Sequence, residues 1–130
     1  MTHATGLANA LRAHARGLHP LEAAAELLIS HTYWLHRSEF TTHFISKYRG
    51  LLIDIELAHV DWPSAVTALD IGALPCSASE GQMLRLAASL AEGIPVDLRD
   101  ALTSLDADNI DLVARAVLHT SGRRQTLHMP

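Results

Sequence analysis

The sequence holds little cysteine: Cys76 is the single one in a chain of 130 residues. One thiol cannot form a disulfide within the chain, so the disulfide framework of small secreted proteins is excluded. Cys76 stands just before a predicted helix, whose dipole would stabilise a thiolate. Because no neighbouring residue supplies a base, we expect a small hydrophobic side chain here and name no catalytic residue.

Long apolar runs are also absent. The stretches Ala23–Ala25 and Leu27–Ile29 are separated by Glu26 and are too short to cross a bilayer. The first nine residues show no basic segment followed by an apolar one, so no signal peptide is predicted. These absences predict a cytoplasmic protein that does not associate with membranes.

Positive charge is scarce and unevenly placed. The formal net charge is −4, with a net charge of +2 in residues 1–50 and −6 in residues 51–130. Domains that bind nucleic acids usually display a strongly basic face, and this signal is weak here, with a local basic patch in the first half of the chain as the alternative left open. We therefore do not expect a nucleic-acid partner.

Apolar residues make up 48% of the chain. At this length one packed domain can fold without a disulfide, structural metal or cofactor. The last stretch of helical periodicity ends at Gly122. Residues 1–122 are therefore predicted to form a single helical domain, and residues 123–130 a flexible C-terminal tail.

The clearest helix start lies at residues 77–82. Ser77 with Glu80 fits a capping box, and so does Ser79 with Gln82, so the start is marked but its register is open. This helix is expected to end at Gly93.

The last helix begins after Asp106 or Asp108. Together with the periodic stretches before it, it predicts an all-α fold, a compact bundle of five to six helices that leaves room for one short extended segment in the middle. The two best-marked helices are expected to share a core made by Met83, Ala87, Leu90, Ile110, Val113 and Val117.

The middle run Leu51–Val60 fits two periods. Apolar and acidic residues alternate from Ile53 to Leu57, as in a strand, yet the run also places apolar residues on one helical face. Gly50 before the run and Pro63 after it favour a short strand. The sequence indicates no second strand, which favours a helix or pairing with another molecule.

Three segments resemble small hypothetical proteins of high-GC actinobacteria: Asp61-Trp62-Pro63, the run from Leu74 to Gln82, and Ile94-Pro95-Val96-Asp97-Leu98. The excess of Arg over Lys and the abundance of Ala fit that source. The resemblance covers the latter half of the chain and implies no activity, so no functional residue is carried over from it.

Nine histidines are the most unusual feature of the composition. His36, Glu39 and His43 would share a face of one continuous helix, where two imidazoles and a carboxylate could hold a transition metal. Ser38 fits the N-cap of that helix, however, which would leave His36 outside it. The alternative is a set of surface histidines that titrate near neutral pH.

Most aromatic area is concentrated in the part of the chain with the poorest helical register. Aromatic residues flanked by Arg37, Lys47 and Arg49 are typical of protein interfaces. The interface residues predicted on this basis are Tyr33, Trp34, Phe40, Phe44 and Trp62. We expect a non-enzymatic interaction or regulatory protein that contacts a protein partner or forms a homodimer.

Two other functions are weighed against this one. The segment 63–70 and the helix from about Ala78 could form a helix-turn-helix, and hence a DNA-associated regulator. The second helix carries one basic residue, Arg85, whereas a recognition helix usually has more donors for phosphates and base edges. The third function is metal binding by the histidines.

Overall fold

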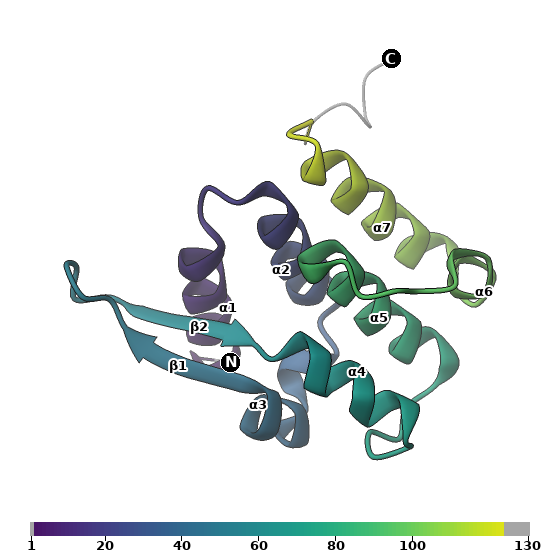
Figure 1. Cartoon of the computed structure of the whole chain (residues 1–130), viewed down its shortest axis with the longest axis horizontal. Coiled ribbons are helices and arrows are strands. Elements are labelled where there is room, and N and C mark those ends of the chain that lie inside the picture. The colour runs from purple at the N-terminus through teal and green to yellow at the C-terminus, as the bar shows by residue number, and fades with distance from the viewer. Residues whose placement is uncertain (1, 124–130) are drawn as a thin grey trace.

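The computed structural model describes residues 2–123 and shows packed helices from which one β-hairpin projects (Figure 1). Met1 and residues 124–130, which make up most of the predicted tail, lie outside the described residues. The elements are α1 (Thr2–Ala15), α2 (His19–His31), the 3-10 turn η1 (Trp34–His36), α3 (Ser38–Phe44), β1 (Ile45–Arg49), β2 (Glu56–Val60), α4 (Trp62–Asp70), α5 (Ala78–Glu92), α6 (Leu98–Thr103) and α7 (Ala107–Thr120).

The protein is predominantly helical, with seven α-helices among residues 2–123, but it is not purely all-α. β1 and β2 form a two-stranded antiparallel sheet. The alternation in Leu51–Val60 indicated a strand, and β2 occupies its second half. The expectation that this strand would lack a partner within the chain is wrong, because β1 lies directly before it and pairs with all five of its residues.

Local capping sets the helix boundaries in the second half of the chain. Ser77 and Glu80 form the capping box of α5, which settles the register that the sequence left open. Asp106 caps α7 by accepting a hydrogen bond from the Asn109 amide at 2.9 Å. Gly93 ends α5 in the left-handed conformation, with φ +71°, which a residue with a side chain adopts only with strain.

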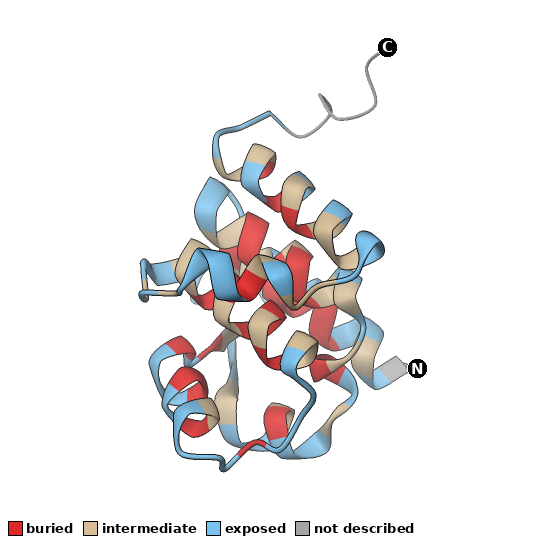
Figure 2. Ribbon diagram, turned by 90° about the vertical axis from the view of Figure 1, so that its right-hand side faces the viewer, coloured by how far each residue is buried: buried red, intermediate tan, exposed pale blue. Residues whose placement is uncertain are grey.

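α5 is the central helix of the bundle. It packs against α2, α4, α6 and α7. Six of its residues are buried: Gly81, Met83, Leu84, Leu86, Ala87 and Ala88. Figure 2 shows buried positions on the inner sides of the helices and exposed ones along the outer surface.

The predicted core of α5 and α7 is confirmed in part. Met83, Ala87 and Val113 are buried, Leu90 is partly buried against the core, and Ile110 is half-buried outside the core cluster. Val117 is 55% exposed, because α7 lies at the edge of the bundle and turns this side away from α2 and α5. Within the described residues, the helices are too short or too polar to cross a membrane.

Candidate functional site

The β-hairpin formed by β1, β2 and the loop between them, residues 45–60, is here called the arm. Its ladder pairs Ile45 with Val60 at one end and Arg49 with Glu56 at the other. The loop closes with a hydrogen bond from the Gly50 amide to the Ile55 carbonyl, 3.1 Å long. Figure 1 shows this loop at the far left of the molecule, beyond the helices.

The end of the arm carries three consecutive aliphatic residues, Leu51, Leu52 and Ile53, here called the tip. Their exposed fractions are 101%, 99% and 64%. Behind them Arg49 and Asp54 form an exposed ion pair of 3.1 Å across the loop. The tip is therefore an apolar surface, and the two charged residues behind it carry no net charge.

Gly50 fixes the shape of this loop. A Cβ atom built on Gly50 would lie 2.7 Å from the Ile53 carbonyl oxygen, closer than real Cβ contacts allow. Only glycine therefore lets the chain return closely enough to present the tip in this conformation.

The arm rests on α1, which packs against β2. His14 of α1 shares a hydrogen bond with the Tyr48 hydroxyl, and its ring centroid lies 5.5 Å from that of His59. Burial, and then the nearby His59, lower the pKa of His14 below its ordinary value. A lowered pKa favours the neutral form of His14 over the protonated one.

A cavity of about 140 Å³ opens beside this contact, and we call it the base cleft. Its lining is mixed: buried apolar side chains, among them Leu11, Leu28 and Trp62, form one part, and the polar side chains of His14, His59 and Glu92 form the other. The half-buried Ala91 and the exposed Glu92 of α5 also line it. Twelve residues line it in all: Leu11, His14, Ala15, Leu21, Ala25, Leu28, Ala58, His59, Val60, Trp62, Ala91 and Glu92.

The predicted interface aromatics lie mainly in the core. Trp34 and Phe40 are 0% exposed and Trp62 is 3% exposed, while Tyr33 and Phe44 are partly buried against them. The Trp34 indole donates a hydrogen bond of 3.0 Å to the Glu80 carbonyl. These aromatics therefore join η1 and α3 to α5, and the three buried ones offer a partner no surface.

The predicted metal ligands are not brought together. His36 ends η1, Arg37 is extended, and Glu39 and His43 belong to α3, so the three do not share one continuous helix. Glu39 instead forms an ion pair with Arg37. Among residues 2–123, no group of three or more His, Cys, Asp or Glu side chains is arranged to hold a metal ion.

The predicted helix-turn-helix pair corresponds to α4 and α5. A recognition helix must present one face to the groove of DNA. α5 is instead enclosed by four other helices, and its Arg85 is tied to Asp70 of α4 at 2.8 Å. This packing disfavours α5 as a reading helix.

Cys76 lies before α5, as the sequence indicated. Partial burial of the thiol, and then the nearby carboxylate of Glu80, raise its pKa above the ordinary value. A raised pKa disfavours the thiolate, which is the nucleophilic form. The environment of Cys76 is therefore not that of an activated nucleophile.

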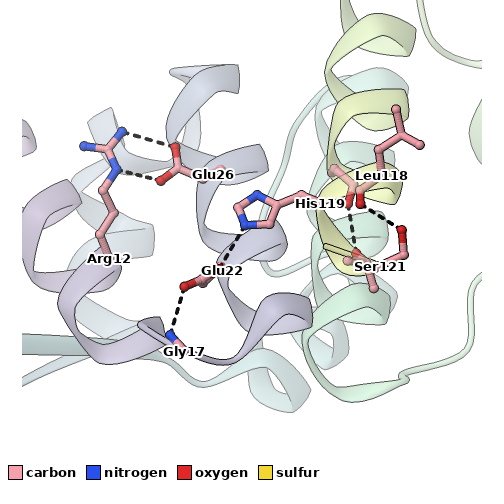
Figure 3. A network of polar contacts seen from close by, with 9 residues as sticks. Arg12, Gly17, Glu22, Glu26, Leu118, His119 and Ser121 are labelled. Carbon is pink, nitrogen blue, oxygen red and sulfur yellow. Dashed lines mark hydrogen bonds and ion pairs between the residues drawn. The ribbon is translucent and has the colours of Figure 1, made fainter. Parts of the chain in front are cut away.

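A larger cavity, about 390 Å³, lies between α1, α2 and α7. Figure 3 shows two of its lining side chains, Arg12 and His119, each paired with a glutamate. Arg12 makes two hydrogen bonds to the Glu26 carboxylate, of 2.7 and 3.2 Å, and His119 bonds to Glu22. These two pairs connect α1 and α7 to α2.

The sequence interpretation located the tip only coarsely. The run Leu51–Val60 was considered for pairing with another molecule, but the interface residues were chosen among the aromatics, and Leu51, Leu52 and Ile53 were not singled out. The available signal was three consecutive aliphatic residues between Gly50 and Asp54, which is unusual for a hairpin loop.

Comparison with known proteins gave no match: no family model, no curated protein and no solved structure is significantly similar to the chain. The resemblance to actinobacterial proteins therefore stays a prediction.

Proposed function

We propose that the protein is a non-enzymatic interaction module that binds a protein partner through the tip of its arm. One observation carries this proposal: Leu51, Leu52 and Ile53 stand in solvent at the end of a projecting hairpin. Burying an aliphatic side chain of this size contributes about 1.5–3 kcal/mol relative to leaving it in water. In the free chain these side chains stay in water, so the contribution is gained only when a partner covers them.

The construction of the loop supports this proposal. A hairpin loop without a binding role usually has polar residues at its end. Here Gly50 and the Arg49–Asp54 pair hold three aliphatic residues outward. Three aliphatic residues in the core of the bundle would stabilise the fold. Their position at the surface instead favours a role in binding a partner.

The proposed site of action is the cytoplasm, since one unpaired cysteine suits a reducing compartment. The partner is expected to supply an apolar pocket or groove that surrounds the tip. The arm has two basic residues, Lys47 and Arg49, and two acidic ones, Asp54 and Glu56. It therefore carries no net charge and would not attract a strongly charged partner.

Photo-crosslinking in cells tests the proposal. A benzophenone amino acid is placed at Leu52 and, as a matched control, at Ile71, which is 73% exposed at the end of α4. We expect one or a few crosslinked proteins, a second copy of the chain included, from position 52 and none of these from position 71. Equal crosslinking from both positions would contradict a role for the tip.

A further inference from the structure

We infer that the tip binds a second copy of this chain, and that two copies insert their tips reciprocally into each other's base clefts. This inference rests on the proposed function and names its partner. It brings together two features of the arm: exposed aliphatic residues at the tip, and a cavity beside the base whose buried lining residues are apolar.

The size of the base cleft suits one side chain of the tip. Its volume is about 140 Å³. A protein cavity of roughly 150 Å³ lined by aliphatic and aromatic side chains is large enough to bind benzene, which is close in size to the side chain of leucine. Leu51 and Leu52, which are fully exposed, are the candidates to fill it.

The arrangement of the arm suits a two-fold axis. When two identical hairpins lie side by side in opposite directions, the end of each lies beside the start of the other. Each strand has five residues and spans roughly 17 Å. Because the cleft is lined by β2 residues at the base of the arm, this antiparallel arrangement brings each tip toward the other copy's cleft.

The area also favours a second copy. Three exposed aliphatic side chains present on the order of 300 Å² of apolar surface. One side of a standard interface covers about 800 Å², so one tip in one pocket falls well short. Reciprocal insertion gives each copy both a tip and an occupied cleft, which roughly doubles the apolar contact.

Charge does not oppose insertion of the tip into the base cleft. The arm carries as many acidic as basic residues, Asp54 and Glu56 against Lys47 and Arg49, so it brings no net negative charge toward the exposed Glu92 of the cleft. Pairing of two β1 strands edge to edge is less favourable, because a two-fold axis at the centre of β1 would oppose Lys47 with Lys47 of the other copy.

Sedimentation equilibrium over a concentration series tests the inference on three variants. Leu51→Ser with Leu52→Ser removes the apolar tip, Ala91→Arg obstructs the cleft, and Ile71→Ser is the matched control at an exposed apolar residue. We expect a wild-type dimer, a dissociation constant raised about 100-fold by either of the first two changes, and no change from Ile71→Ser. Melting temperatures close to that of the wild type show that each variant folds.

Mixing the tip variant with the cleft variant makes the test specific. The mixed dimer keeps one intact tip opposite one intact cleft, so resonance energy transfer between the two labelled variants should appear although neither associates alone. A wild-type monomer at all concentrations, a dimer indifferent to the tip variant, or no association on mixing would overturn the inference.

The same measurements separate this inference from the proposed function. A monomer whose residue 52 crosslinks to a different protein overturns reciprocal pairing and leaves the interaction module standing. A monomer that co-sediments with phosphatidylglycerol vesicles through the tip, without a protein crosslink, overturns both.

Discussion

His119 at the end of α7 and Glu22 in the first turn of α2 are joined by a hydrogen bond of 3.0 Å between Nε2 and Oε1, although 97 residues separate them. The other oxygen of Glu22 accepts a hydrogen bond of 2.9 Å from the Gly17 amide. His119 is 8% exposed. One carboxylate therefore fixes both the α1–α2 corner and the last helix (Figure 3).

We predict that acid pH lowers the free energy of unfolding through protonation of Glu22. The Gly17 amide, and then His119, hold the pKa of Glu22 below its ordinary value of 4.5. Since the folded-state pKa is the lower one, the contribution of Glu22 to stability is complete above about pH 4.5 and is lost as the pH falls through the folded-state pKa. Urea unfolding at a series of pH values should show a shallower acid loss for Glu22→Gln.

Glu26→Gln is the matched control, one turn further along α2. Its carboxylate pairs with Arg12 at the surface, where such a pair contributes about 0–1 kcal/mol. This variant should keep the acid step of the wild type. A remaining step in Glu22→Gln is expected from Glu80, whose pKa is lowered first by the Ser77 amide. Identical acid profiles for the wild type and Glu22→Gln would contradict the prediction.

A second loss of stability should begin at a higher pH, through His14. Burial, and then His59, lower the pKa of His14, so the folded chain takes up this proton less readily than the unfolded one. The free energy of unfolding therefore starts to fall as the pH drops below about 6.5 and stops falling below the folded-state pKa. The groups around His14 are Tyr48, His59 and Glu92.

His14→Gln removes the titrating ring and should flatten the stability profile between pH 7 and pH 5. The exposed His3 of the same helix gives the control variant, His3→Gln, which should keep the wild-type slope. His31 contributes to the remaining slope, because burial lowers its pKa as well. An unchanged slope in His14→Gln would show that the arm contact is insensitive to this proton.

The second half of the fold could be predicted from the sequence because its signals are local. The capping box of Ser77 and Glu80 and the cap at Asp106 act within three residues. β1 could not be predicted, since four of its five residues are exposed and its strand conformation depends on the ladder with β2. The core position of Trp34 was hidden for a related reason: η1 and α3 are too short to display a helical period.

The candidate site was predictable only in part. The run Leu51–Val60 was recognised as fitting both a strand period and a helical one, with pairing to another molecule as one outcome. Exposure of Leu51 and Leu52, and burial of Ala58 and Val60 from the same run, depend on where the hairpin leaves α1. The point where the hairpin extends beyond α1 is set by tertiary packing. The periodicity of apolar residues in the sequence therefore could not separate the tip from the base.

Gly50→Ala should alter the tip and spare the fold. The new Cβ would lie 2.7 Å from the Ile53 carbonyl, so the loop backbone must shift. Because the loop is exposed, the melting temperature of the body should change little, whereas association through the tip should weaken. Amide chemical shifts should change at residues 49–55 and stay constant in α6, none of whose residues lines the base cleft. Shifts spread through the bundle, or unaltered association, would contradict this prediction.

Two other glycines should respond to alanine in opposite directions. Gly6 lies within α1 with no atom within 4 Å of an added Cβ, so Gly6→Ala should stabilise the fold by about 0.5–1 kcal/mol. Gly93 also has open space but adopts φ +71°, so Gly93→Ala should destabilise it by about 1–2 kcal/mol. Urea unfolding of both variants checks the pair. Effects of the same sign would show that space, and not backbone conformation, decides the outcome at these positions.

Trp34 should be a determinant of stability and have no direct role in association. The side chain is 0% exposed, its ring centroid lies 5.3 Å from that of Phe40, and its indole bonds to the Glu80 carbonyl. Trp34→Ala should cost about 3–5 kcal/mol, which can unfold a domain whose total stability is about 5–15 kcal/mol. Trp34→Phe keeps most of the ring and loses the hydrogen bond, so a smaller cost is expected and the fold should persist.

Urea unfolding measures the loss of stability in both Trp34 variants. In sedimentation equilibrium, Trp34→Phe should show the same association state as the wild type. A folded Trp34→Phe variant that no longer associates would contradict this prediction and support the interface role that the sequence suggested for Trp34.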